Sequence, residues 1–228
     1  MLGYVKEKLF LLKHRKDISD IHQIMWVYTF VFVVWGLYRL LFPVHVWIEE
    51  TILKFLVFGV PTFWVVFYKE KRSLEDLGMS TRGLIVSLYF GLLFGLWLAV
   101  FGNVVSFIND GSLGFNLDLT VSDFRDLLVL GLFTAFWEQI LFMGYMLPRL
   151  VRALRHEMLA ISIVALLFAV LHMPIQIVSG VGFAQLTIRF ILLFTLEFGN
   201  GVLYLRFKNL AAPIFAHLAW GSVIFLFG

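Results

Sequence analysis

The sequence predicts an all-α protein: a polytopic transmembrane helical bundle of seven to eight membrane helices with an interfacial N-terminal helix. Of the 228 residues, 61% are hydrophobic and 14% are charged, and the mean hydropathy is +0.92. A soluble domain of this size is about half apolar and about a quarter charged. The apolar residues also fall in runs of roughly 20, the length that crosses a hydrocarbon core of about 30 Å. No linker divides the chain, so residues 1–228 are expected to form a single membrane domain.

The first predicted element is the basic segment 1–20, which mixes Lys and Arg with a short apolar run. It lacks the features of a cleavable signal, and we expect an amphipathic helix on the cytoplasmic membrane surface. Seven candidate spans follow, at 23–42, 51–68, 84–108, 127–147, 158–173, 183–205 and 211–227. The fifth is short and ends at Pro174, so residues 175–181 could resume it as an eighth segment.

The distribution of charge predicts the orientation. With the N-terminus in the cytoplasm, the outer loops carry mainly acidic residues, namely Glu49, Glu50, Asp110, Asp118, Asp123 and Asp126. The inner loops carry fourteen of the 18 basic residues: Lys6, Lys8, Lys13, Arg15, Lys16, Lys69, Lys71, Arg72, Arg82, Arg149, Arg152, Arg155, Arg206 and Lys208. This is the positive-inside bias of an integral membrane protein. Basic clusters between apolar runs favour membrane lipid, and not nucleic acid, as the partner.

The chain has no cysteine, which excludes disulfides, thiol catalysis and thiolate metal sites. Deep in the spans lie the polar residues Asn103, Glu138, Gln139, His172, Glu197, Asn200 and His217, where chemistry is expected. Ionisable groups there face the bundle interior and mark function. The alternative is a hydrogen bond that joins helices, and we expect it for Asn103, Glu197 and Asn200. The last two share a helical face and can bond each other, Arg189 or Arg206.

Glu138, His172 and His217 stand apart because their predicted depths agree. At a rise of 1.5 Å per residue, Glu138 lies about 16 Å from Arg149 at the inner boundary, and His217 lies about 14 Å from Lys208. His172 is about 22 Å from the start of its span. The three side chains can therefore meet near the middle of the bilayer.

One carboxylate and two imidazoles support several kinds of chemistry. They could activate a water and stabilise the oxyanion that forms on attack. They could form a metal site with two histidines and one carboxylate, although the His-Glu-x-x-His signature is absent. A proton relay in a transporter and a purely structural network are the other interpretations. The residues alone leave these alternatives open.

The string that begins at Glu138 reads Glu-Gln-Ile-Leu-Phe-Met-Gly-Tyr-Met-Leu-Pro-Arg-Leu. It resembles the first motif, EExxFRG, of the CAAX prenyl protease and bacteriocin-processing (CPBP) family of intramembrane glutamate proteases. Phe168 and His172 resemble the second motif, FxxxH. The run 209–217, which ends at His217, resembles the last motif, which closes as HxxxN. Residues 201–206 and 73–78 are similar to a linker and a cytoplasmic loop of the family, and 121–228 is the motif-bearing core.

The resemblance implies a metal-independent, cofactor-free endopeptidase that cleaves a membrane-associated or lipidated peptide or protein. It implies that Glu138 and His172 activate the attacking water and that His217 serves as oxyanion partner. It also implies a bacterial inner membrane as the location. No metal ligand is expected.

Three positions depart from the family pattern: Gln139 replaces the second Glu, Met143 the Arg, and Gly221 the final Asn. Residues i and i+4 share a helical face, so we interpret Gln139 and Met143 as a coupled exchange in a structural pair. At Gly221 an Asn amide would donate to the oxyanion, and losing such a donor costs about 10²–10³ in rate. Either a water or Asn200 replaces it, or the protein is a non-catalytic membrane adaptor or bacteriocin-immunity-type relative. A small proton-coupled transporter is the third hypothesis, although the chain shows no inverted repeat.

Overall fold

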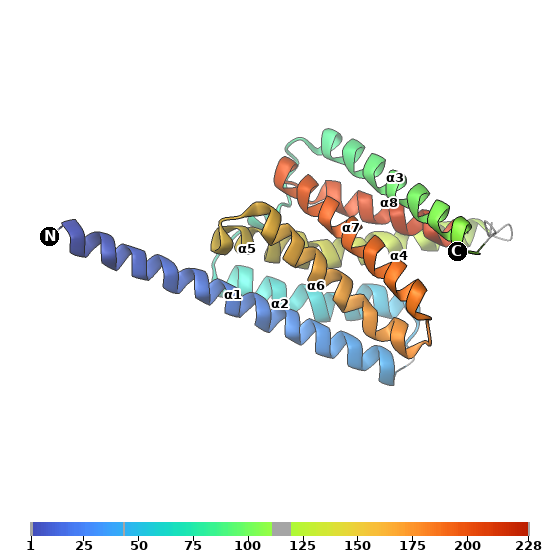
Figure 1. The fold of residues 1–228 in the computed structure, drawn as a ribbon, viewed down its shortest axis with the longest axis horizontal. Coiled ribbons are helices and arrows are strands. Elements are labelled where there is room, and N and C mark those ends of the chain that lie inside the picture. The colour runs from blue at the N-terminus through green and yellow to red at the C-terminus, as the bar shows by residue number, and fades with distance from the viewer. Residues whose placement is uncertain (1, 43, 111–119, 228) are drawn as a thin grey trace.

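The computed structural model describes residues 2–42, 44–110 and 120–227, and every element in these ranges is helical (Figure 1). The long helices are α1 (Leu2–Leu41), α3 (Leu84–Asp110), α4 (Val121–Gln139), α6 (Glu157–Val178), α7 (Phe183–Phe207) and α8 (Ala211–Phe227). The short elements are η1 (Ile48–Leu53), η2 (Phe55–Gly59), α2 (Val60–Phe63), η3 (Trp64–Lys69), η4 (Glu75–Leu77), η5 (Ile140–Met146) and α5 (Leu147–Leu154). Among these, η4 is a 3₁₀ helix and the other η elements are π-helical. Asp118, which was predicted to lie in an outer loop, falls outside the described residues.

Six helical segments in the described part of the chain are long and apolar enough to cross a membrane, and the predicted class of integral membrane protein is confirmed. They are Ser19–Leu41, Ile48–Lys69, Leu84–Val105, Val121–Leu154, Glu157–Val178 and Phe183–Phe207. Helix α8 corresponds to the seventh predicted span, is shorter at 17 residues, and packs along α3 (Figure 1).

The predicted end of the fifth span at Pro174 is wrong. Helix α6 continues through this proline to Val178, and a short turn leads directly to Phe183 at the start of α7. A proline inside a helix removes one backbone hydrogen bond, but neighbouring membrane helices make this tolerable. Residues 175–181 therefore complete α6 and its following turn, and they do not form an eighth span.

The N-terminal segment is helical as predicted but is not a separate interfacial element. Helix α1 runs unbroken from Leu2 to Leu41 and projects from one end of the bundle (Figure 1). The sequence between Tyr4 and Trp35 contains no Gly or Pro, so nothing interrupts the backbone hydrogen bonds between the basic segment and the first span. The segment 1–20 is thus an extension of a membrane helix.

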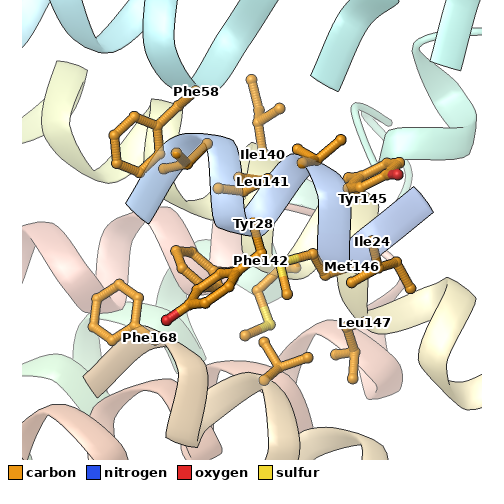
Figure 2. Packing of buried hydrophobic residues seen from close by; sticks show 14 of the residues in the cluster. Ile24, Tyr28, Phe58, Ile140, Leu141, Phe142, Tyr145, Met146, Leu147 and Phe168 are labelled. Carbon is orange, nitrogen blue, oxygen red and sulfur yellow. The ribbon is translucent and has the colours of Figure 1, made fainter. Parts of the chain in front are cut away.

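The hydrophobic core centres on the π-helical turn η5, whose residues are all buried. Figure 2 shows Phe142 and Tyr145 of this turn among side chains from α1, η2 and α6. The rings of Phe142 and Phe168 meet edge to face with centroids 5.1 Å apart. The hydroxyl of Tyr28 donates to the carbonyl of Leu167 at 2.9 Å. Because η5 directly follows Glu138 and Gln139, this packing holds both residues at the centre of the bundle.

Helices α3 and α8 approach closely through small residues. Gly91 and Gly95 of α3 lie against the backbone of Ala212 and Ala216 in α8, and a Cβ at either glycine would come within 2.9 Å of an alanine Cα. Small residues four apart allow this close approach in membranes, where burial in lipid provides no hydrophobic drive for association. The contact at Ala216 also sets the position of His217.

We expect Gly95→Ala to destabilise the protein by about 1–3 kcal/mol, because the added methyl group overpacks a backbone contact that cannot yield. Unfolding in mixed micelles titrated with sodium dodecyl sulfate measures the effect. Gly102→Ala on the same helix is the matched control, since its Cβ would meet only the Leu192 side chain, at 3.6 Å. Equal stability of the two variants contradicts the prediction.

The loop before α3 docks onto the start of α8. Leu77 is fully buried, Gly144 lies against its carbonyl, and the backbone amide of Leu210 donates to the Gly78 carbonyl at 2.9 Å. The Ser73 amide donates to Asp76 at 2.9 Å, and this bond holds the pKa of the Asp76 carboxyl below its usual value. The loop thereby fixes the end of the helix that carries His217.

Candidate functional site

Glu138 lies on the last turn of α4, just before η5, with only 1% of its surface exposed. Its Oε1 accepts a hydrogen bond from Lys54 Nζ at 2.6 Å. Its Oε2 has no hydrogen-bond partner among the described residues and lies 3.8 Å from both His172 Nε2 and His217 Nε2. The structure therefore brings together the three residues whose depths agreed in the sequence, and they meet at one carboxylate oxygen.

His172 comes from α6 and keeps part of its ring exposed, with 21% of the side-chain surface accessible. Its Nδ1 lies 2.9 Å from the backbone carbonyl of Phe168, one turn earlier. A carbonyl only accepts, so Nδ1 carries the proton and Nε2 of the neutral ring presents a lone pair toward Glu138. Phe168 also packs on this ring, with centroids 4.6 Å apart. Phe168 thus orients His172 through both its backbone and its side chain.

His217 comes from α8 and is 7% exposed. Its Nδ1 lies 3.3 Å from Gln139 Nε2. The ring also contacts Phe168 edge to face at 5.8 Å and Trp220 at 6.0 Å between centroids. His217 is therefore held on two sides by aromatic rings and on a third by an amide.

Gln139, Glu197 and Asn200 form a second buried cluster beside the first. Gln139 Nε2 donates to Glu197 Oε2 at 2.9 Å, and Asn200 Nδ2 donates to the same oxygen at 3.0 Å. The predicted bond between Glu197 and Asn200 is confirmed. Arg189, one of the two arginines considered as partners, bonds Gln176 instead.

The expectation that Gln139 and Met143 are a coupled exchange in one structural pair stays a prediction. Met143 lies fully buried in the hydrophobic core, whereas the Gln139 amide contacts His217. Asn103 bonds the carbonyl of Ala99 in its own helix at 2.9 Å and takes no part in the site.

Sequence reasoning missed Lys54 and gave Glu50 no part in the site. Lys54 is 2% exposed, and its Nζ lies 2.7 Å from Glu50 Oε2 as well as 2.6 Å from Glu138 Oε1. Thr134 donates to Glu50, and the Trp35 ring lies 4.9 Å below the Lys54 ammonium. A lone lysine near the end of a span normally extends to the membrane surface, which hides such a residue from a sequence pattern. The available signal was its position inside a predicted span, four residues after Glu50.

Gly221 leaves open space one turn beyond His217. A Cβ at this position meets no described atom within 4 Å. Asn200, considered as a replacement donor, gives one of its two amide hydrogens to Glu197 at 3.0 Å. Compensation of Gly221 by Asn200 stays a prediction.

Lys54 also bears on the metal interpretation. The described residues contain no group of three or more His, Asp or Glu side chains arranged to hold a metal ion. The Lys54 ammonium already compensates the Glu138 carboxylate at 2.6 Å and would repel a second cation there. The arrangement suits proton transfer and hydrogen bonding.

The fold and the site define a class, that of polytopic membrane proteins with a buried carboxylate–imidazole centre. More specifically, residues 120–223 match the family described as type II CAAX prenyl endopeptidase Rce1-like. The match spans a little under half of the chain and contains Glu138, His172 and His217. The predicted resemblance to the CAAX protease family is confirmed over this segment, and that family is one of proteases. Comparison with curated proteins and with solved structures finds no match.

Proposed function

We propose that the protein is an intramembrane glutamate endopeptidase, in which Glu138 and His172 activate a water that cleaves a membrane-associated or lipidated peptide. The observation that carries the proposal is the unpartnered Oε2 of Glu138, 3.8 Å from two imidazole Nε2 atoms. Polar atoms this far apart are bridged by one water at ordinary hydrogen-bond lengths of roughly 2.8 Å. Buried ionisable groups in a membrane bundle mark function by default.

In the proposed reaction the water donates its protons toward Glu138 Oε2 and the lone pair of His172 Nε2. Its oxygen adds to the peptide carbonyl carbon as one proton moves to the Glu138–His172 pair. The carbonyl oxygen becomes an oxyanion, to which His217 donates. The C–N bond then breaks, and the stored proton passes to the leaving amine.

An apolar groove supports a substrate with a hydrophobic part. It holds about 530 Å³ and runs between α4, α8 and the loop before α3. Phe136 in its wall precedes Glu138 by two residues, and Phe215 precedes His217 by two. A lipid chain or apolar segment in the groove would hold the adjoining peptide near the site. The groove is lined by Gly78, Met79, Ser80, Thr81, Leu132, Phe133, Phe136, Asn209, Leu210, Ala211, Ile214 and Phe215.

The test uses the purified full chain in lipid nanodiscs with excess chelator and two peptides of one sequence, with and without a lipid anchor. We expect cleavage of the anchored peptide, a larger KM for the free one, and a kcat/KM lower by about 10³-fold or more for Glu138→Gln. In a single turnover in ¹⁸O-labelled water, the new carboxyl terminus should carry the label, because water attacks the peptide directly. Unlabelled product would show a covalent intermediate on Glu138, and cleavage by the variant at the wild-type rate would overturn the assignment.

The empty space at Gly221 gives a direct prediction. We expect Gly221→Asn to fold normally, because nothing described lies within 4 Å of the new Cβ, and to raise kcat by about 10²–10³, the usual effect of one oxyanion donor. Gly221→Leu is the control, since it adds similar volume without a donor. If both variants have the wild-type kcat, position 221 does not face the oxyanion.

The absence of a side-chain donor at Gly221 also favours a second function, that of a non-catalytic membrane adaptor or immunity-type protein. A missing donor at Gly221 and a catalytic carboxylate paired with Lys54 at 2.6 Å both suit a site without turnover. On that hypothesis, well-folded Glu138→Ala and His172→Ala variants keep full biological activity in cells. Loss of activity in both well-folded variants contradicts the adaptor hypothesis.

We also propose that the N-terminus is cytoplasmic and that the protein resides in a bacterial inner membrane, the latter on the resemblance alone. Basic side chains gather where α5 and the segment after η3 meet: Arg149 forms a buried ion pair with Glu70, which Arg72 joins at 3.2 Å. Arg152 pairs with Asp20 of α1 at 3.4 Å. This basic end is the one that the positive-inside rule assigns to the cytoplasm.

A further inference from the structure

Gln139, Glu197 and Asn200 are each fully buried, and they link α4 to α7 beside His217 of α8. Two amide nitrogens, Gln139 Nε2 at 2.9 Å and Asn200 Nδ2 at 3.0 Å, converge on Glu197 Oε2. The proposed mechanism uses none of these residues. A buried polar cluster of this kind is costly unless its groups are satisfied in one particular arrangement.

The hydrogen-bond roles in this cluster follow from the chemistry of each group. A carboxylate oxygen that receives two bonds is an acceptor, so the NH₂ group of Gln139 must face Glu197. The second hydrogen of that NH₂ group is then available to His217 Nδ1, 3.3 Å away. An NH₂ group only donates, so Nδ1 of the neutral ring must accept.

We propose that Gln139, oriented by Glu197, holds neutral His217 in the tautomer with its proton on Nε2, directed at Glu138 Oε2. His172 has the opposite tautomer, because its Nδ1 donates to the Phe168 carbonyl at 2.9 Å. Two imidazoles thus face one carboxylate oxygen at the same distance of 3.8 Å, one as acceptor and one as donor. Gln139 therefore acts as a positioning residue for His217.

This division gives the two histidines different tasks, and here the inference rests on the proposed function. An acceptor at His172 suits proton removal from water, and a donor at His217 suits the oxyanion. Gly221 offers no side chain that could donate to the oxyanion. The Nε2 proton of His217 is therefore more important for stabilising it. Fixing that proton in advance avoids reorganisation during the reaction.

The tautomer can be measured without any substrate. In full-length protein with ¹⁵N-labelled histidine, the side-chain nitrogen shifts distinguish a protonated Nε2 from a protonated Nδ1, and loss of signals in His217→Asn identifies the residue. We expect the proton on Nε2 in the wild type. In Gln139→Glu, a carboxylate accepts from the ring, and we expect the proton on Nδ1.

Gln139→Glu also places a second carboxylate beside Glu197 and lowers stability if both are ionised. The double variant Gln139→Glu, Glu197→Gln removes this problem, because the new amide at 197 donates to the new carboxylate at 139. We expect the double variant to have wild-type stability and the proton of His217 on Nδ1. Its kcat should fall about 10²-fold with KM unchanged, since the oxyanion donor is lost while substrate binding remains.

Asn103→Leu is the control. Among the described residues the Asn103 amide bonds the Ala99 carbonyl of its own helix at 2.9 Å, so the change should affect neither tautomer nor kcat. A wild-type His217 with its proton on Nδ1 overturns the inference, as does a double variant that keeps Nε2–H. If the tautomer changes in the double variant but the wild-type protein cleaves no peptide, the positioning role is supported and only the proposed function is rejected. A flipped tautomer with wild-type kcat supports the positioning and overturns its catalytic purpose.

Discussion

Glu138→Gln is expected to lower kcat/KM for peptide cleavage by about 10³-fold or more. The amide keeps the size of the side chain but cannot accept the proton of the attacking water. A general base typically raises the reaction rate by about 10²- to 10⁴-fold, which is the size of the loss expected here. Lys54 retains Glu50 as a partner at 2.7 Å, so the fold should survive. Product formation by mass spectrometry, with thermal unfolding in detergent beside it, measures both expectations.

Glu49→Gln is the matched control for this variant. Glu49 lies in η1, beside Glu50, but its carboxylate pairs with Arg39 at 2.6 Å and not with a residue of the site. It should cleave the peptide at the wild-type rate. A Glu138→Gln protein that is folded and equally active would remove Glu138 from the mechanism.

Lys54→Met is expected to destabilise the protein by about 3–5 kcal/mol, the usual effect of breaking a buried ion pair on one side. Lys54 is 2% exposed and lies between two carboxylates, at 2.6 Å from Glu138 and 2.7 Å from Glu50. Removing the ammonium leaves both carboxylates buried near one another without a counter-charge. Unfolding in mixed micelles measures the loss, and the surviving folded fraction should cleave peptide poorly.

Two comparisons separate charge from packing in this prediction. Lys69→Met makes the same change at an exposed lysine of the same span and should shift stability by less than about 0.5 kcal/mol. The double variant Lys54→Met, Glu50→Gln should be more stable than Lys54→Met, because one unpaired carboxylate is gone and neighbouring effects are not additive. A double variant less stable than the single would show that Lys54 acts through packing.

The candidate site shows where sequence reasoning succeeds. Glu138, His172 and His217 were found because each is a polar residue inside an apolar run, and helix rise converts sequence distance into depth. Glu50 was missed because its span begins at Ile48, three residues before the predicted start. Lys54 was missed although it lies inside the predicted span, because it is close to the predicted boundary, where a lysine normally reaches the membrane surface. A residue close to a span boundary can be buried or exposed, and the boundary itself depends on neighbouring helices.

Gln139 illustrates a different failure, because the sequence did not predict which distant residues its amide contacts. Its partners Glu197 and His217 lie 58 and 78 residues away in the chain. No local pattern links residues at such separations, and only the packing of α4, α7 and α8 brings them together.

The sequence by itself determined that this chain is a membrane helical bundle with a glutamate and two histidines at one depth. The physical reason is that lipid satisfies no backbone hydrogen bond, so long apolar runs must be helices and buried charges must face inward. Tertiary structure alone decided which helix faces meet, through contacts such as Gly95 on Ala216. It also decided that Lys54 compensates Glu138 and that Gln139 directs His217. These choices depend on close packing between distant segments, and packing is a property of the folded bundle and not of any one helix.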